Sequence, residues 1–495
     1  MDISLERKFL SSFKLIGSGK KICDISSDIV VPDTKEDILR VIMTNADYRI
    51  RSKDVESGRV VVHGELNVTA VYVPESGAGL STLSTDIPFE CEFEIETADS
   101  GCAAVAELSV ISVDTRILNP RKVMINAQVG VSQKCYCNCD FSWYTAPTEA
   151  PKNTFFKKNS TDIRLINLVT EKTFSIENDF QTQNIDDGAQ LIAAPVTFCT
   201  DSAEAVGSKL IVKGHADIKA VFCSGTDLQS GETTVSYSQI FELPERDVVP
   251  DYIVSVLPTG DFFELRDGKV SFEIHAVMQI VCTETRGIEF VEDAYVCGAE
   301  TQLDNEDKAV CITERVIRQT ETAQLTHNAD FDIEKVLYMS GIVGTPKLSD
   351  GEYTVPLTVE AVCLSVDDQI RSLKLHGSVG LEIEADQNEL IESVSASIAS
   401  LKSNVSGREI TVTATIAADA RLNECRTLQI ISSVTVNEPE ANITLPSVYM
   451  CIPASDDLWS IAKRYSSDID MIIALNNLDE NVDISGRLLI IPRIK

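Results

Sequence analysis

The sequence has few basic residues, few aromatic residues and no long hydrophobic run. Its 495 residues include 43 Lys and Arg against 76 Asp and Glu, a formal net charge of −33. So acidic a chain repels phosphates, and we expect neither nucleic acid nor an anionic membrane surface as its main partner. No apolar run approaches the ~18 residues of a membrane-spanning helix, so we expect no insertion into a membrane. Hydrophobic residues still make up 44% of the chain, which is enough for packed cores.

An export signal is also missing from the first twenty residues. Charged side chains such as Glu6, Lys8 and Lys14 interrupt this stretch, so it lacks the apolar segment of a secretory signal. The 14 cysteines are scattered, and in a chain that is not exported they are expected to be reduced thiols. The sequence therefore predicts a cytosolic protein.

Catalytic patterns are lacking as well. Gly17–Lys21 resembles a phosphate-binding loop, but Lys14 stands where the first glycine is required and Lys21 where Ser or Thr is required. The five histidines are far apart and fall in strand-like stretches, where a structural role is more common. No nucleophile-elbow, zincin or EF-hand pattern occurs. We therefore expect a protein that is not an enzyme and has no cofactor.

Three cysteines lie close together, at Cys135, Cys137 and Cys139. On an extended strand their thiols point to one face and are a weak candidate for a soft metal. Structural zinc sites usually have a C-x₂₋₄-C spacing, and no second Cys or His pair is near in sequence. We favour small hydrophobic residues on a buried strand face, and expect no metal site.

The chain repeats itself about every 150 residues. Three similar segments contain Asp28, Asp179 and Asp330. A second landmark agrees, because residues 59–72 (RVVVHGELNVTAVY) match residues 209–222 (KLIVKGHADIKAVF). The landmarks alternate apolar and polar residues and are flanked by turn signals, which is typical of antiparallel strands. We therefore predict a mainly β fold of three tandem sandwich-like or barrel-like repeat domains.

Polar and Pro-rich stretches give the domain boundaries, and the only short helix expected within the repeats is Lys35–Met43. The predicted order is domain 1 over 1–145, a linker over 146–160, domain 2 over 161–303, domain 3 over 304–437, a second linker over 438–446 and a different domain over 447–495.

After Ser447 the apolar period changes from that of a strand to that of a helix. Leu458, Ile461, Ala462 and Tyr465 lie at i, i+3, i+4 and i+7, with an aspartate before them as N-cap. A second helix and two flanking apolar stretches predict a strand–helix–helix–strand domain.

This C-terminal segment resembles a LysM domain, through Asp457–Tyr465 (DLWSIAKRY), Leu475–Leu478 (LNNL) and Leu488–Pro492 (LLIIP). The resemblance implies an α/β domain that binds N-acetylglucosamine polymers in a shallow groove. The usual Gly-Asp-Thr run before the first helix is replaced by Pro453–Asp457, which removes the glycine that lets a ligand approach the backbone.

The whole architecture resembles the SipL-type spore coat morphogenetic proteins, in which repeated SPOCS domains precede one LysM domain. Strands such as Val62–Val68 (VHGELNV) carry the SPOCS part of the resemblance. It implies a scaffold in endospore coat assembly, in the mother-cell cytoplasm at the forespore surface. Its LysM domain would dock on the coat-basement ATPase SpoIVA. Other coat proteins and self-association are further partners, and a cell-wall or cortex protein that binds peptidoglycan is the alternative.

A binding patch is expected on the rims of the LysM groove. Trp459 lies off the apolar stripe of its helix and Lys463 is one turn further on, so both are candidate interface residues. The same position would also let Trp459 cap the small core. The predicted set is Asp457, Leu458, Trp459, Lys463, Asn476, Asn477 and Leu478.

Overall fold

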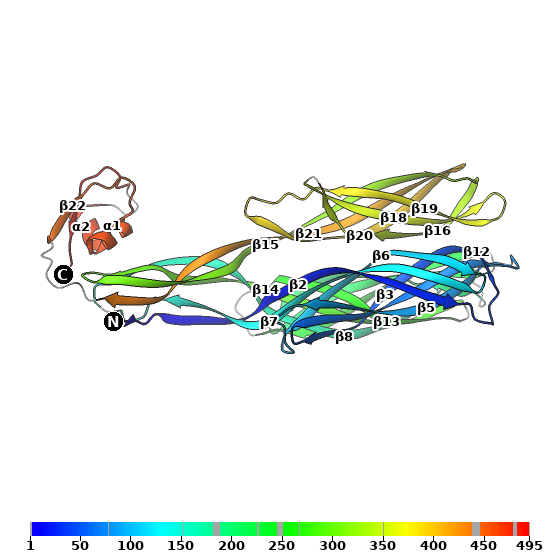
Figure 1. Cartoon of the computed structure of the whole chain (residues 1–495), viewed down its shortest axis with the longest axis horizontal. Helices are drawn as coiled ribbons and strands as arrows, with labels where there is room; N and C mark the ends of the chain where they lie inside the picture. The colour runs from blue at the N-terminus through cyan, green and yellow to red at the C-terminus, as the bar shows by residue number, and fades with distance from the viewer. Residues whose placement is uncertain are drawn as a thin grey trace.

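The computed structural model is an elongated β protein with a small helical unit at one end (Figure 1). It describes residues 2–77, 79–150, 152–181, 189–224, 227–244, 251–266, 268–349, 351–437, 446–478 and 483–494. The prediction of a mainly β fold is confirmed, because the described helices α1 and α2 have only eight residues each. No helix among these residues is long and apolar enough to cross a membrane.

The first unit is a sandwich of two three-stranded layers. One layer has the order β3–β4–β5 and the other β2–β7–β6, all antiparallel. Alternating side chains such as Val62, Phe89 and Ile125 fill the space between the layers. The strands are β2 (Glu6–Val30), β3 (Ile38–Glu56), β4 (Arg59–Pro74), β5 (Ser81–Glu94), β6 (Ala103–Asn119) and β7 (Lys122–Thr145), preceded by β1 (Asp2–Ile3).

The second unit has the same strand pairing. Its layers are β8–β14–β13 and β10–β11–β12, with the short β9 beside β11. The bounds are β8 (Thr154–Gln181), β9 (Gln190–Ala193), β10 (Val196–Val206), β11 (Lys209–Ser224), β12 (Asp227–Glu242), β13 (Asp251–Arg266) and β14 (Lys269–Val296).

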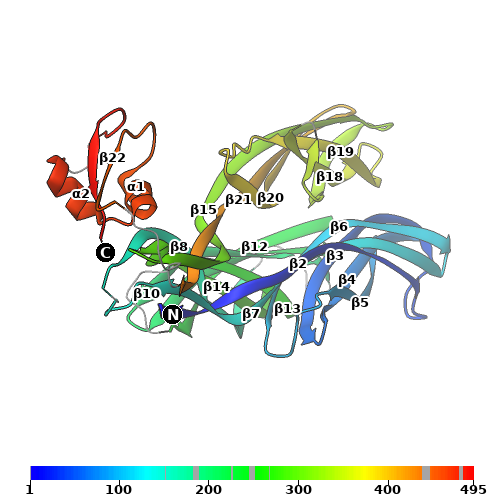
Figure 2. The same cartoon turned by 60° about the vertical axis from the view of Figure 1, so that its left-hand side comes forward.

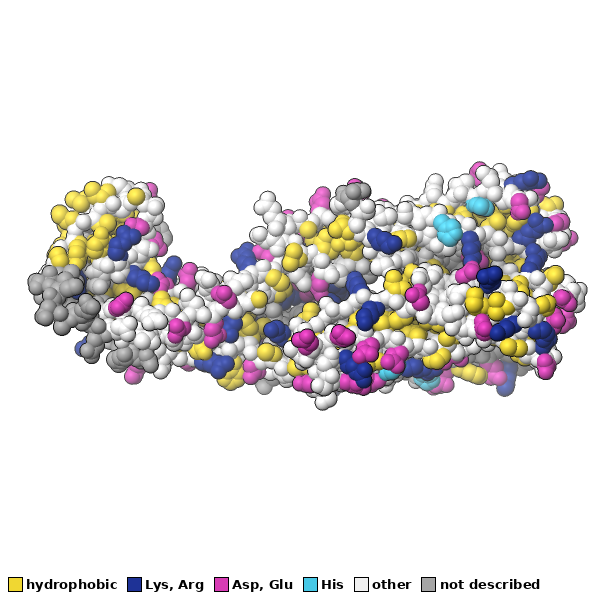
Figure 3. Space-filling view, in the orientation of Figure 1, with side chains coloured by type: hydrophobic (Ala, Val, Ile, Leu, Met, Phe, Trp, Pro, Cys, Tyr) yellow, Lys and Arg dark blue, Asp and Glu magenta, His cyan; other side chains and the backbone are white. Residues whose placement is uncertain are grey.

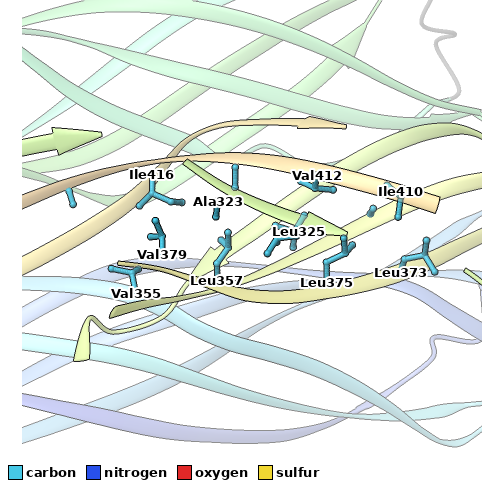
Figure 4. Packing of buried hydrophobic residues seen from close by; sticks show 14 of the residues in the cluster. Ala323, Leu325, Val355, Leu357, Leu373, Leu375, Val379, Ile410, Val412 and Ile416 are labelled. Carbon is cyan, nitrogen blue, oxygen red and sulfur yellow. The ribbon is translucent and has the colours of Figure 1, made fainter. Parts of the chain in front are cut away.

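The third unit pairs β15–β21–β20 and β16–β18–β19, with β17 beside β18. Figure 4 shows its core, where Leu325 and Val412 from one layer face Leu357 and Leu375 from the other. The bounds are β15 (Glu300–Asn328), β16 (Ile333–Val343), β17 (Lys347–Ser349), β18 (Glu352–Ser365), β19 (Ile370–Leu381), β20 (Glu389–Ser406) and β21 (Glu409–Asn437).

A glycine faces an aromatic ring across the sheet in each of the first two units. Gly64 pairs with Phe89, and Gly214 pairs with Tyr237. A Cβ at Gly64 would lie 2.2 Å from the Phe89 ring, and one at Gly214 would lie 2.3 Å from the carbonyl oxygen of Cys199. Glycine is required at both positions because the neighbouring ring or backbone occupies the space of a side chain.

The three units pack against one another through one shared apolar cluster. It combines side chains from all three smaller layers, including Met43 of β3, Val221 of β11 and Val362 of β18. The expected helix at Lys35–Met43 is wrong, because β3 begins at Ile38 and pairs with β4. Burial of Ile42 and Met43 in the shared cluster outweighs the weak local helix preference.

The long strands continue past the sandwiches as a stalk that leads to the C-terminal unit (Figures 1 and 2). Apolar clusters around Trp143, Phe290 and Val434 hold these strands together. The domain boundaries placed at 161 and 304 fall inside β8 and β15. Most of the linker placed at 438–446 lies outside the described residues.

The C-terminal unit consists of β22 (Val448–Cys451), α1 (Leu458–Tyr465), α2 (Ile469–Asn476) and β23 (Leu489–Pro492). Its two strands pair antiparallel, with Met450 opposite Ile490. Ile461, Ile472 and Ile491 form its core and are fully buried. The predicted order of elements is therefore present, in two short helices and a two-stranded sheet.

Candidate functional site

Aspartates cap both helices of the C-terminal unit, and the sequence predicts such a cap for the first one. Asp457 is the N-cap of α1 and accepts a hydrogen bond from the backbone N–H of Ser460 at 2.9 Å. Hydrogen bonds from the side chain and backbone of Ser460 hold the pKa of Asp457 below its usual value. Asp468 caps α2 in the same way, through the N–H of Asp470. Asp457 therefore fixes the start of α1.

Trp459 and Lys463 point toward the end of β14. The indole Nε1 of Trp459 donates to Asp293 Oδ2 at 2.7 Å, and Lys463 Nζ donates to Asp293 Oδ1 at 2.6 Å. The Trp459 ring also meets the Tyr295 ring edge-on, with centroids 5.0 Å apart. In this structure these two residues of the predicted patch contact the chain's own second unit.

Tyr295 connects the same two parts of the molecule. Its hydroxyl donates to the carbonyl oxygen of Ser467, between α1 and α2, at 2.7 Å. Its ring stacks on Phe155 at 5.1 Å, and burial raises its pKa. Tyr295 and Cys297 belong to the same apolar cluster as Ile461 and the rest of the C-terminal core. The end of β14 is thus part of the core that supports the C-terminal unit.

The other residues of the predicted patch have local contacts. Asn476 joins α2 to β23, because its Nδ2 donates to the Ile490 carbonyl at 2.7 Å and its Oδ1 accepts from the Ile490 N–H at 2.7 Å. Asn477 ends α2 in the left-handed conformation, with φ of 48°. Leu458 and Leu478 are half-buried against the core. Trp459 and Lys463 thus share Asp293, whereas Asn476 bonds within the C-terminal unit.

A different surface of the C-terminal unit is strongly apolar. The outward face of its two-stranded sheet and the adjacent face of α2 present apolar side chains that are 37–68% exposed. Figure 3 shows this concentration at the end of the molecule. We call it the apolar face; its members are Val448, Met450, Ile452, Met471, Leu475, Leu488 and Ile490.

The sequence contains a pattern that could have predicted this apolar face. Residues 448–452 and 488–491 are apolar in both phases of the strand alternation. Two short helices can cover only one side of a two-stranded sheet, so the other phase must remain exposed. Exposed apolar patches of this kind mark interaction surfaces in monomeric proteins.

A cavity of about 680 Å³ lies where the long strands of the three units meet. Ion pairs cross it: Arg164 contacts Glu314 at 2.8 Å, and Lys134 contacts Glu392. Arg164 also bonds Asp251 at 2.8 Å, which lies on β13. The Arg164–Glu314 and Lys134–Glu392 pairs join strands of different units, and we assign them a structural role.

Comparison with known families identifies the first unit. Residues 37–118 match the family model described as SipL, SPOCS domain. This match supports a SipL-type protein. The matched stretch runs from just before β3 to just before the end of β6, so the SPOCS domain covers one whole layer of the first sandwich and the edge strand of the other. This domain relates the chain to sporulation. A search of curated proteins finds no match.

Proposed function

We propose that the chain is a non-enzymatic scaffold in endospore coat assembly. Its C-terminal LysM unit would dock on the SpoIVA-type coat-basement ATPase at the forespore surface, in the mother-cell cytoplasm. The SPOCS match supports the link to sporulation. The observation that carries the docking proposal is the apolar face, which is solvent-exposed in the isolated chain.

The apolar face has the composition of a protein interface rather than of a glycan site. Sugar recognition needs polar groups that converge on hydroxyls. The outward sheet face instead presents Met450, Ile490 and Leu488, without a polar side chain between them on that face. Flexible, polarisable methionines suit a surface that packs against a protein. Burial of this face would supply most of the affinity, at roughly 25 cal/mol per Å² before the costs of association.

The arrangement of the units supports the proposed scaffold role. The three sandwiches share one apolar cluster, whereas the C-terminal unit is held at the far end of the stalk. A partner on the LysM unit is therefore kept close to whatever binds the sandwiches, which raises the effective concentration of one for the other.

The test is a binding titration of the full chain against the purified ATPase and, in parallel, against soluble chitin oligomers. We expect binding to the ATPase and a loss of at least tenfold in affinity with Leu475→Glu, because the glutamate would be desolvated in the interface. Leu390→Glu is the matched control, since Leu390 is 68% exposed on the third unit. Binding to the oligomers alone would overturn the proposal and favour the glycan-binding alternative, and equal losses of ATPase affinity with both variants would show that the apolar face is not the docking surface.

A further inference from the structure

Three thiols and a carboxylate gather at the end of the first unit that faces away from the shared apolar cluster. The turn between β5 and β6 folds against β7 at this point, and Cys102 on the turn meets Cys135 and Cys137 on the strand. The turn itself is fixed, because Gly58 and Ala98 are joined by a backbone hydrogen bond of 3.0 Å. The residues are distant in sequence and are brought together only by the sandwich.

Three of these donors are close enough to share one ion. The carboxylate of Asp99 and the thiols of Cys102 and Cys137 all lie within 4.8 Å of one another. Cys102 Sγ lies 3.5 Å from Asp99 Oδ1, and Cys135 packs in the same apolar cluster as Cys102 and Cys137. Cys102 is thus the centre of the group.

The turn holds Asp99 in place. The N–H of Gly101 donates to Asp99 Oδ1 at 2.7 Å, and the N–H of Cys102 donates to the Asp99 carbonyl at 3.0 Å. Such backbone bonds orient a carboxylate before a ligand arrives, as the outer contacts of metal ligands do. Asp99 is exposed and Cys137 is half-exposed, so the group is open to solvent on one side while Cys135 is fully buried.

As neutral thiols Cys102 and Cys137 gain little from this arrangement, because thiols are weak hydrogen-bond donors. A divalent cation would hold both sulfur atoms and the Asp99 carboxylate, because it stabilises thiolates and accepts mixed sulfur and oxygen ligands.

We propose that Asp99, Cys102 and Cys137 form a Zn²⁺ site. Two thiolates and one carboxylate supply three ligands, water takes the fourth tetrahedral position on the exposed side, and each thiol loses its proton to solvent when the metal binds. The ion would fasten the β5–β6 turn to β7. A disulfide between Cys102 and Cys137 would exclude the ion, because it removes both thiolates. The inference does not depend on the scaffold function.

The structure departs from the weak sequence candidate in its members. Cys139 is exposed, and its thiol contacts the carbonyl oxygen of Asp140 at 3.8 Å. Asp99 and Cys102 of the β5–β6 turn meet Cys137 instead, whereas Cys135 is buried beside them.

A second donor group, of Cys199, His215 and Asp217, lies on the surface of the second unit, also within 4.8 Å. It holds one thiol instead of two, so cobalt spectroscopy distinguishes the two groups: thiolate-to-metal charge-transfer absorption grows with the number of coordinated thiolates. Cys199→Ser is therefore the matched control for the proposed site.

The experiment titrates the reduced, metal-free full chain with Co²⁺ and then displaces it with Zn²⁺. We expect one tightly bound Co²⁺ with tetrahedral d–d bands and charge-transfer absorption of two thiolates. Cys137→Ser should weaken binding at least tenfold, and Asp99→Asn should keep the charge-transfer intensity. Cys199→Ser should leave both unchanged.

Three results would overturn the proposal. One is the absence of stoichiometric thiolate-bound Co²⁺ in the parent chain. Another is loss of the signal with Cys199→Ser but not with Cys137→Ser. The third is a Cys102–Cys137 disulfide found by mass spectrometry in chain purified without reductant. Thermal unfolding of each metal-free variant shows whether it folds, and Cys137→Ser is expected to fold because its side chain is half-exposed.

Discussion

Asp293 accepts a hydrogen bond from the indole of Trp459 at 2.7 Å, across 166 residues of sequence. Asp293 follows a β-bulge in β14, where Val291 and Asp293 pair with consecutive residues of β8. Bulges commonly redirect a side chain in this way. The same carboxylate binds Lys463, so one acidic residue at the end of the stalk holds two residues of α1.

Asp293→Ala should release the C-terminal unit from the stalk. A hydrogen bond to a charged group contributes about 1.5–3 kcal/mol, and the substitution removes two such bonds to Asp293. In a Trp143→Phe background, where Trp459 is the remaining tryptophan, the fluorescence emission should shift to longer wavelength as the indole becomes hydrated.

The matched control for this substitution is Glu292→Ala. Glu292 is the neighbouring acid, and its exposed carboxylate lies 3.4 Å from Lys157. Exposed ion pairs contribute little, so this variant should keep the parental emission. Identical emission from Asp293→Ala and the parent would show that Asp293 does not hold the unit.

Two buried glutamines in the large sheet should differ in their response to substitution by leucine. Gln279 joins the first two units: its Oε1 accepts from the Ala106 N–H at 3.0 Å and its Nε2 donates to the Ala106 carbonyl at 2.8 Å. Gln279→Leu removes both bonds, at a cost of about 1–3 kcal/mol for each buried group left unpaired. The midpoint of urea unfolding should fall.

Gln133 is also buried, but neither polar atom of its side chain has a hydrogen-bond partner among the described residues. Gln133→Leu should therefore leave the urea midpoint unchanged or raise it, since an unpaired buried amide is replaced by an apolar group. Equal losses from the two substitutions would contradict the contacts assigned to Gln279.

Gly214→Ala should destabilise the second unit. The new Cβ would lie 2.3 Å from the Cys199 carbonyl oxygen, so the strands β10 and β11 must move apart. Overpacking of this kind costs about 1–3 kcal/mol or more. Gly380→Ala is the control, because no described atom lies within 4 Å of a Cβ there. A thermal-shift assay should show a lower transition for Gly214→Ala alone; equal transitions would argue against the close contact.

The N-cap of α1 should make that helix sensitive to acid. The folded pKa of Asp457 is lowered by hydrogen bonds from Ser460, so its stabilisation is present above the unfolded pKa of about 4 and is lost as the pH falls through the folded pKa. Amide hydrogen exchange in residues 458–465 should therefore become faster at low pH. Asp457→Asn should keep the cap and remove this change, whereas Asp457→Ala should cost about 1 kcal/mol at neutral pH. Unchanged exchange in the Ala variant would rule out the cap.

The local elements of this protein were largely determined by its sequence. Alternation in stretches such as Lys122–Val131 predicted strands, and the i, i+3, i+4 spacing from Leu458 predicted α1, because these patterns require only that one face be buried. The error at Lys35–Met43 arose where burial in a cluster shared by three units, rather than local preference, decides the conformation.

Only the tertiary structure decided which residues meet. The sequence could show that Trp459 lies off the apolar stripe of its helix, but not that Asp293 would bind it, nor that Asp99 and Cys102 would reach Cys137. These contacts depend on strand register, on a bulge and on how the long strands extend past the sandwiches. The periodicity of apolar residues shows which face of a helix or strand is buried. It does not show which distant residues pack against that face or against the opposite one.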